Sequence, residues 1–239
     1  MRIFEGGKPD EVAKKAGDTL NSVLEKYKDL PILLLLSGGS SFDILQYINP
    51  DLCDESVTVG VLDERFSPDP KINNFAILKA TPFFQICTEA GTKFIDTSIP
   101  KGEELPEATM KYDTALREWV ANNPTGKVIA IMGIGLDGHT AGIMPYPDNP
   151  SLFQRLFEDP DTWVTGYDAT SDRNEHPLRI TTTLSFIRIN VSVAIVYVIG
   201  NKKKEPLKRT IAKSGNILTT PARVIHDIKH VAVCTNINM

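Results

Sequence analysis

Four short stretches of the chain are apolar at nearly every position. They occupy residues 31–36, 57–62, 127–132 and 191–199. A strand that is apolar on both of its faces is typical of a parallel sheet that helices cover on both sides. The pattern therefore predicts four buried strands of one sheet.

Segments with the apolar spacing of amphipathic helices alternate with these strands. The first begins near Asp10, which can cap it. One face of this helix carries Val12, Ala16, Leu20, Val23, Leu24 and Tyr27. Residues 104–122 and 201–213 have similar spacing, and residues 42–48 predict a short helix after the first strand. This alternation predicts an α/β protein with a doubly wound, mostly parallel sheet. Because no linker or repeat interrupts it, we interpret residues 1–239 as a single domain.

Composition and charge exclude several classes of function. A net charge of −4 provides no positive field for general binding of nucleic acid. No apolar stretch approaches the ~20 residues of a membrane span, and the N-terminus lacks the apolar core of a signal peptide. The three cysteines are far apart and form no CxxC pair, so we expect neither disulfides nor a zinc knuckle. We expect a cytoplasmic protein, either a monomer or a small homo-oligomer.

The loop after the first strand is a candidate phosphate site. Ligands of doubly wound sheets bind at the carboxyl ends of the strands. The loop consists of Ser37, Gly38, Gly39, Ser40 and Ser41. Its glycines allow the backbone to approach a ligand closely, and its hydroxyl and N–H groups favour an anion such as phosphate. The alternative is a plain strand-to-helix turn with capping serines.

The second strand ends in Asp63, Glu64 and Arg65, and Asn74 follows in a turn. Two carboxylates beside an arginine can bind or polarise a polar ligand. The alternative is an exposed turn with a local ion pair, in which Asn74 only caps a helix.

The third strand leads into the segment with the strongest chemical signal. Four glycines lie between positions 133 and 142, and they frame Asp137 and His139. Histidine is the side chain best suited to proton transfer near neutral pH, so His139 is a candidate general base. Gly138 and Thr140 join the candidate ligand-binding residues.

Further basic residues follow at Arg173, Arg179 and Lys203. Such groups usually lie on solvated faces, and the functional alternative is a cation that reaches the phosphate loop. His226 and His230 have a metal-like spacing, but their surroundings predict strand and loop, and no third ligand is evident. We therefore predict no metal site.

Several motifs, in their order and approximate spacing, resemble the 6-phosphogluconolactonase family. They are SGGSS, LDERFSPDPKINNF, GIGLDGHTAGIMP, RITTTLSFI and VIGNKKKEPLKRTI, and the likeness covers residues 30–225. The wider superfamily includes glucosamine-6-phosphate deaminase/isomerase. The resemblance implies a Rossmann-like fold and hydrolysis of 6-phospho-D-glucono-1,5-lactone to 6-phosphogluconate in the pentose phosphate pathway, with no obligatory cofactor.

The resemblance also implies roles for single residues. His139 would activate water, and Asp137 would orient that water or a sugar hydroxyl. Arg65 would meet the phosphate or the developing oxyanion, while the serine–glycine loop would hold the ligand. In this chain Arg173 and Asn174 stand where the family commonly has a lysine that helps to hold the phosphate.

Two other functions stay open from the sequence. The deaminase branch has a glutamate five residues after the histidine, and this chain has Met144 there, which favours the lactonase. A phosphosugar-binding protein without turnover is the other alternative.

Overall fold

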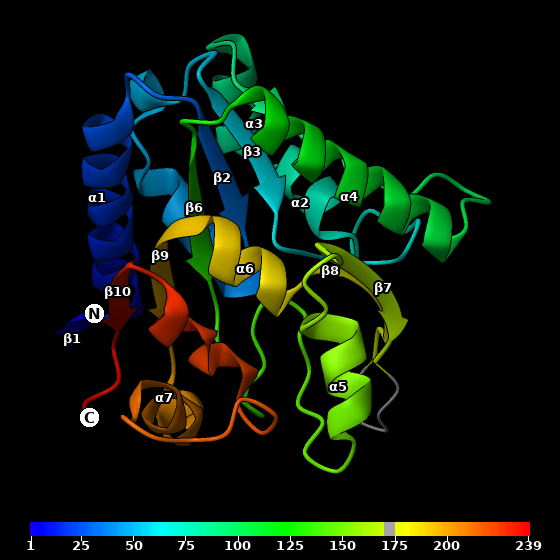
Figure 1. The fold of residues 1–239 in the computed structure, drawn as a ribbon. Coiled ribbons are helices and arrows are strands. Elements are labelled where there is room, and N and C mark those ends of the chain that lie inside the picture. Colours follow the sequence, from blue (N-terminus) through cyan, green and yellow to red (C-terminus); the bar gives the residue numbers. More distant parts are fainter. Residues whose placement is uncertain (170–174) are drawn as a thin grey trace.

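The computed structural model describes residues 1–169 and 175–239. Its main feature is a seven-stranded, wholly parallel sheet in the order β1-β10-β9-β6-β2-β3-β5 (Figure 1). The strands are β1 (Arg2–Glu5), β2 (Ile32–Leu36), β3 (Val57–Val61), β5 (Lys93–Phe94), β6 (Lys127–Met132), β9 (Val191–Val198) and β10 (His230–Thr235). The predicted α/β class and mostly parallel sheet are confirmed, and the four predicted strands are β2, β3, β6 and β9.

A second, antiparallel sheet lies beside the first. It has three strands in the order β4-β8-β7, namely β4 (Asp63–Arg65), β8 (Leu178–Thr182) and β7 (Val164–Asp168). This small sheet and the strands β1 and β5 were not predicted from the sequence, whereas the strand expected around His230 is β10. The apolar runs of the strands that were not predicted are short or interrupted, so their pairing depends on distant parts of the chain.

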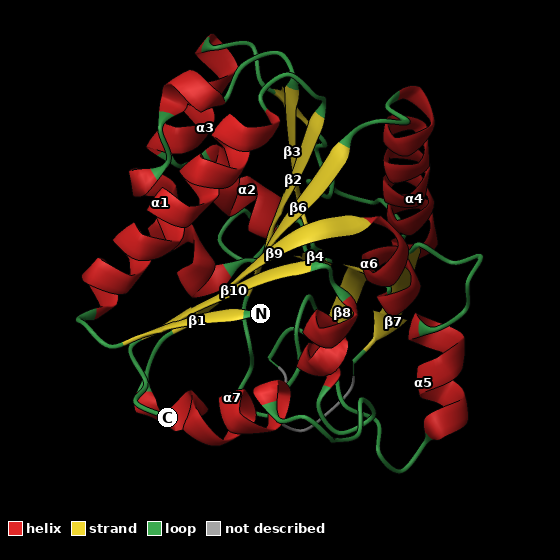
Figure 2. Ribbon diagram, turned by 60° about the vertical axis from the view of Figure 1, so that its left-hand side comes forward, coloured by secondary structure: helices red, strands yellow, loops and turns green. Residues whose placement is uncertain are grey.

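Helices cover both faces of the large sheet. Figure 2 shows α1, α2 and α3 on one side and α4 and α6 on the other. The helices are α1 (Pro9–Tyr27), α2 (Asn74–Lys79), α3 (Pro82–Glu89), α4 (Leu105–Asn122), α5 (Pro150–Phe157), α6 (Leu184–Asn190) and α7 (Lys204–Ile211). None of the helices in the described residues is long and apolar enough to span a membrane.

Three local expectations need correction. Helix α1 begins at Pro9 after Lys8, and the backbone N–H of Lys8 donates to Glu11, so Asp10 lies in the first turn and does not cap it. Residues 39–47 form a 3₁₀ segment, η1 (Gly39–Tyr47), in place of the short α-helix predicted at 42–48. The predicted helix at 201–213 is a 3₁₀ turn, η3 (Asn201–Lys203), followed by α7.

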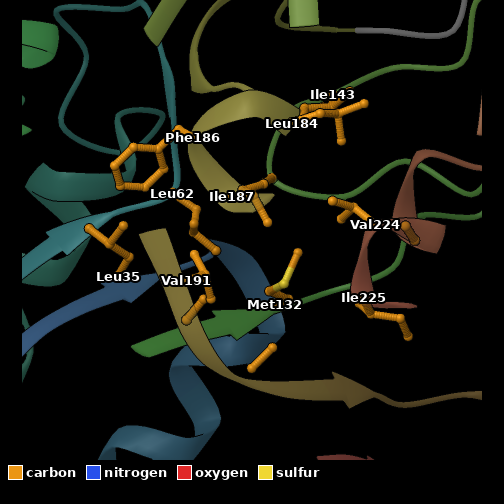
Figure 3. Close-up of a cluster of buried hydrophobic side chains, with 14 of the residues drawn as sticks. Leu35, Leu62, Met132, Ile143, Leu184, Phe186, Ile187, Val191, Val224 and Ile225 are labelled. Carbon is orange, nitrogen blue, oxygen red and sulfur yellow. The ribbon is translucent and has the colours of Figure 1, made fainter. Parts of the chain in front are cut away.

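The alternation of side chains along β2 explains why the sheet is buried on both faces. Leu34 and Leu36 pack with α1, whereas Leu33 and Leu35 pack with α4 and α6 on the other side. Figure 3 shows part of this second cluster. It includes Leu62 after β3 and Met132 at the end of β6, so the core anchors the strand ends from which the functional loops begin.

Candidate active site

A cleft of about 350 Å³ opens at the carboxyl ends of the central strands. After β2 the chain adds β3 and β5 on one side and then β6, β9 and β10 on the other, so the strand order switches between β2 and β6. Loops diverge at such a point and leave room for a ligand. The lining consists of Ser37, Gly38, Gly39, Ser40, Ser41, Asp63, Arg65, Asn74, Gly133, Ile134, Gly135, Leu136, His139, Thr140, Ala141, Gly142, Arg179 and Lys203.

The loop 37–41 continues directly from β2. The backbone N–H of Ser37 still donates to Ile131 of β6 at 2.9 Å, and the Ser41 hydroxyl turns back to the Gly38 carbonyl at 3.0 Å. A Cβ atom on Gly38 would lie 2.2 Å from Asn74 Oδ1, so only glycine allows this approach. The absence of a side chain at Gly38 therefore allows the loop to pack against the start of α2.

The loop after β6 closes on itself through hydrogen bonds. The Gly135 N–H donates to the His139 carbonyl at 2.8 Å, and the Thr140 hydroxyl donates to the Gly133 carbonyl at 2.7 Å. Gly138 has a φ of +100°, a conformation that favours glycine, and packs against Thr220. The predicted ligand contact of Gly138 is not supported, because Gly138 is buried against Thr220 and does not line the cleft.

His139 and Asp137 form a pair at the edge of the cleft. Nδ1 of the imidazole lies 2.6 Å from Asp137 Oδ1, and the His139 backbone N–H donates to the same oxygen at 3.0 Å. Burial opposes ionisation of Asp137, but the hydrogen bonds and the charge of His139 prevail and lower its pKa. We expected Asp137 to orient water or a sugar hydroxyl. Its observed contact is with the imidazole.

Two arginines lie side by side on the small sheet. Arg65 of β4 and Arg179 of β8 are directly opposite each other in the antiparallel ladder, and both line the cleft. Like charges at opposed positions repel each other, so an anion between them would be favourable. Asp63 Oδ2 lies 3.8 Å from Arg179 Nη1 and offsets part of this charge.

Burial changes the acidity of the charged groups around the cleft. It raises the pKa of Asp63, while Arg179 acts against that rise. It lowers the pKa of Arg179, which Asp63 partly offsets. Lys203, in η3 after β9, is half-buried, and burial lowers its pKa. In the described part of the chain no carboxylate forms an ion pair with Lys203.

Glu64 does not face the cleft, unlike its neighbours in sequence. It is fully buried, and its carboxyl group accepts hydrogen bonds from backbone N–H groups and from the hydroxyl of Thr97. The direct ligand contact that we expected of Glu64 is therefore wrong, because its oxygens already have protein donors.

Three buried polar atoms of the cleft lack a hydrogen-bond partner among the described residues. They are Ser37 Oγ, Arg65 Nε and Asn74 Oδ1. A buried polar group without a partner is costly, and such groups concentrate where a ligand or water completes the structure. Their position supports a polar ligand in this cleft.

The structure brings most of the predicted site residues together around this one cleft. Those that line it are Ser37, Gly38, Gly39, Ser40, Ser41, Asp63, Arg65, Asn74, His139, Thr140, Arg179 and Lys203. Arg173 and Asn174 lie outside the described residues. Ile134, Leu136 and Ala141 also line the cleft and were not predicted, since apolar side chains in a glycine-rich loop carry no chemical signal of their own.

His226 and His230 do not form a metal site in the described structure. His226 Nε2 contacts the carbonyl of Thr210 at 2.8 Å, whereas His230 begins strand β10. No group of three or more potential metal ligands occurs among the residues described.

Comparison with known protein families shows to which family the chain belongs. The family model described as glucosamine-6-phosphate isomerases/6-phosphogluconolactonase matches residues 7–234. The chain belongs to this family. The family predicted from the motifs is thereby confirmed, although no curated protein sequence matches the chain.

Solved structures of this family share the fold at low sequence identity. The 6-phosphogluconolactonase from Trypanosoma brucei superposes with a TM-score of 0.78 at 18% identity, covering 98% of this chain and 95% of that chain. The enzyme from Shewanella baltica gives 0.77 at 18% identity, with 99% and 98% covered. A monomeric glucosamine-6-phosphate deaminase gives 0.73 at 16% identity, with 99% and 97% covered. Both branches of the family therefore share this architecture.

Proposed function

We propose that the protein hydrolyses 6-phospho-D-glucono-1,5-lactone to 6-phosphogluconate. One observation carries the proposal: the imidazole of His139, paired with Asp137, lies on the same cleft as the Arg65–Arg179 pair and the loop 37–41. A lactone carbonyl is already electrophilic. Hydrolysis therefore needs only a base for water, positive charge for the oxyanion and a binding site for the phosphate.

In this mechanism Asp137 sets the tautomer of His139. Its carboxylate is within hydrogen-bond distance of Nδ1, so Nδ1 carries the proton and donates a hydrogen bond to Asp137, and Nε2 presents a lone pair. Nε2 takes a proton from water while the water oxygen bonds to the lactone carbonyl carbon. The imidazolium then returns this proton to the ring oxygen as the carbon–oxygen bond of the ring breaks, and the new carboxylic acid loses its proton to solvent.

The positive side chains bind the charged parts of the substrate. Arg65, Arg179 and Lys203 supply charge for the phosphate and for the oxyanion of the tetrahedral intermediate. Binding the phosphate far from the reacting carbon orients the carbonyl toward the water on His139. The protein residues provide each of these functions, so the proposed reaction includes no cofactor.

Deamination of glucosamine 6-phosphate is the second candidate, because a deaminase shares the fold. By the family resemblance, ring opening in that branch uses a glutamate at the position of Met144. Here the Met144 side chain is partly buried and packs against the hydrophobic core. A thioether cannot transfer a proton, so this position favours lactone hydrolysis.

Turnover of freshly prepared 6-phosphogluconolactone tests the proposal. The rate of product formation, after subtraction of spontaneous hydrolysis, should be well above zero for the wild-type protein. His139→Asn should lose most of this turnover, by ~10²–10⁴-fold, because the general base is removed. Its KM should change little, since His139 does not supply the charge that holds the phosphate.

Two assays on the same preparations separate the alternatives. Release of ammonia from glucosamine 6-phosphate without lactone hydrolysis would assign the deaminase activity. Binding of 6-phosphogluconate without turnover of either substrate would assign a phosphosugar-binding protein. Unchanged lactone turnover in His139→Asn would place the base elsewhere.

A further inference from the structure

Glu64 separates two residues of the cleft along strand β4. Asp63 and Arg65 on either side line the cleft, whereas the Glu64 side chain points away from it and is 0% exposed. A buried carboxyl group costs free energy unless donors surround it, so its partners indicate its purpose.

The two oxygens of Glu64 contact different parts of the structure. Oε1 accepts the backbone N–H of Arg65 at 2.7 Å and the backbone N–H of Asn74. Oε2 accepts the backbone N–H of Phe75 at 2.9 Å and the hydroxyl of Thr97 at 3.0 Å. Oε1 therefore joins the backbones of two cleft residues, and Oε2 contacts residues that do not line the cleft.

The position of the Asn74 side chain depends on this contact between β4 and α2. Its Nδ2 donates to the Asp63 carbonyl at 2.9 Å, and Gly38 leaves just enough space for its Oδ1. Arg65 in turn lies opposite Arg179 in the small sheet. A shift of β4 relative to α2 would therefore displace both Arg65, which lines the cleft, and the Asn74 side chain beside the loop 37–41.

We propose that Glu64 is a positioning residue for substrate binding. Through Oε1 it fixes Arg65 and Asn74 relative to each other, and so it holds the substrate-binding groups of β4 and α2 in one arrangement. This inference rests on the proposed lactonase function for its kinetic readout. It assigns Glu64 no contact with the substrate.

Two variants separate positioning from general stability. Glu64→Asp withdraws the carboxyl group by one methylene and removes its reach to α2, so KM for the lactone should rise about tenfold or more, which corresponds to ~1.4 kcal/mol of binding. Glu64→Gln keeps the reach and can keep its amide oxygen on Arg65 and Asn74, so its KM should stay near that of the wild type. Its NH₂ group faces the Phe75 N–H, so its melting temperature should nevertheless fall.

Thr97→Val is the matched control, because it removes the hydroxyl donor on Oε2 and leaves Oε1 untouched. It should lower the melting temperature with KM unchanged. A KM that rises equally in Glu64→Asp and Glu64→Gln, or stays at the wild-type value in both, would overturn the proposal, since a purely structural role does not distinguish the two oxygens.

Two further measurements test the proposal if Glu64→Asp does not fold or if the wild type hydrolyses no lactone. If Glu64→Asp does not fold, amide hydrogen exchange on Glu64→Gln decides: Arg65 and Asn74 should stay protected while Phe75 exchanges faster, and equal loss at all three would refute the proposal. If the wild type hydrolyses no lactone, the proposed function fails on its own. Calorimetric binding of 6-phosphogluconate then replaces KM, with the same order expected among the variants.

Discussion

At the scale of single residues, the position of the His139 imidazole depends on a glycine four residues earlier. A Cβ atom at Gly135 would lie 2.2 Å from both Nδ1 and Cε1 of the ring. Real side-chain atoms do not approach so closely, so any larger residue would push the imidazole away from Asp137. The glycine at 135 is therefore a requirement of the proposed base and not only of the turn.

Gly135→Ala should consequently reduce kcat by ~10²-fold or more, approaching the effect of His139→Asn. Gly133→Ala is the comparison within the same loop: a Cβ there meets no protein atom within 4 Å, and because Gly133 lines the cleft, any effect of the added methyl group falls on KM. It should leave kcat close to the wild-type value. Steady-state kinetics on both variants checks this, and equal kcat values in the two would show that the position of the imidazole does not limit the reaction.

At the scale of elements, short segments position the charged groups. Strand β4 has three residues and α2 has six, yet they carry Asp63, Arg65 and Asn74 to the cleft. Elements this short are not stable alone and rely on tertiary contacts. The buried carboxyl group of Glu64 and the Asn73 side chain, whose Nδ2 donates to the Thr97 carbonyl at 3.2 Å, provide such contacts.

The pH dependence of stability should reveal this buried carboxyl group. Burial raises the pKa of Glu64 to about 8, although its hydrogen-bond donors act against the rise. The unfolded chain releases this proton near an ordinary pKa of ~4.3, so the stabilising contribution is complete at lower pH and is lost as the pH rises through about 8.

The free energy of unfolding of the wild type should therefore fall relative to that of Glu64→Gln between pH 5 and pH 9. Denaturant titrations at several pH values measure both proteins, and titrations of other groups cancel in the difference. A difference that stays constant, or that changes in the opposite direction, would show that the pKa of Glu64 is not raised in the folded protein.

At the scale of the whole molecule, the cleft joins segments from most of the chain. Its groups come from the loop after β2, from β4, from the loop after β6, from β8 and from η3, so an anion bound there links parts that are over 160 residues apart, such as Ser37 and Lys203. A ligand that binds only the folded state stabilises the entire fold, by ~2.7 kcal/mol at a concentration of 100 Kd.

Inorganic phosphate should consequently raise the melting temperature of the protein. Lys203→Ala should reduce this shift, because Lys203 lines the cleft. Lys202→Ala is the matched control, since Lys202 is the exposed neighbour outside the lining and carries the same charge. Thermal denaturation with increasing phosphate measures all three proteins. Equal shifts in the two variants would show that phosphate binds elsewhere.

The sequence by itself determined the central architecture and predicted most of the polar residues that line the cleft. The apolar runs that became β2, β3, β6 and β9 were long enough to predict strands covered on both sides. Parallel strands end at the same edge of a sheet, so the motifs that follow β2, β3 and β6 were expected to meet there. Local periodicity and chain direction were sufficient for these predictions.

Only the tertiary structure decided how these residues face one another. The pairing of β4 with β8 places Arg65 opposite Arg179 across more than 110 residues of chain, and no local pattern encodes such a pairing. In the same way, Glu64 turned into the protein between two residues that line the cleft, and Asp137 turned toward the imidazole. Side-chain direction in short, irregular segments depends on which distant donors and cations lie nearby, and folding alone brings those groups together.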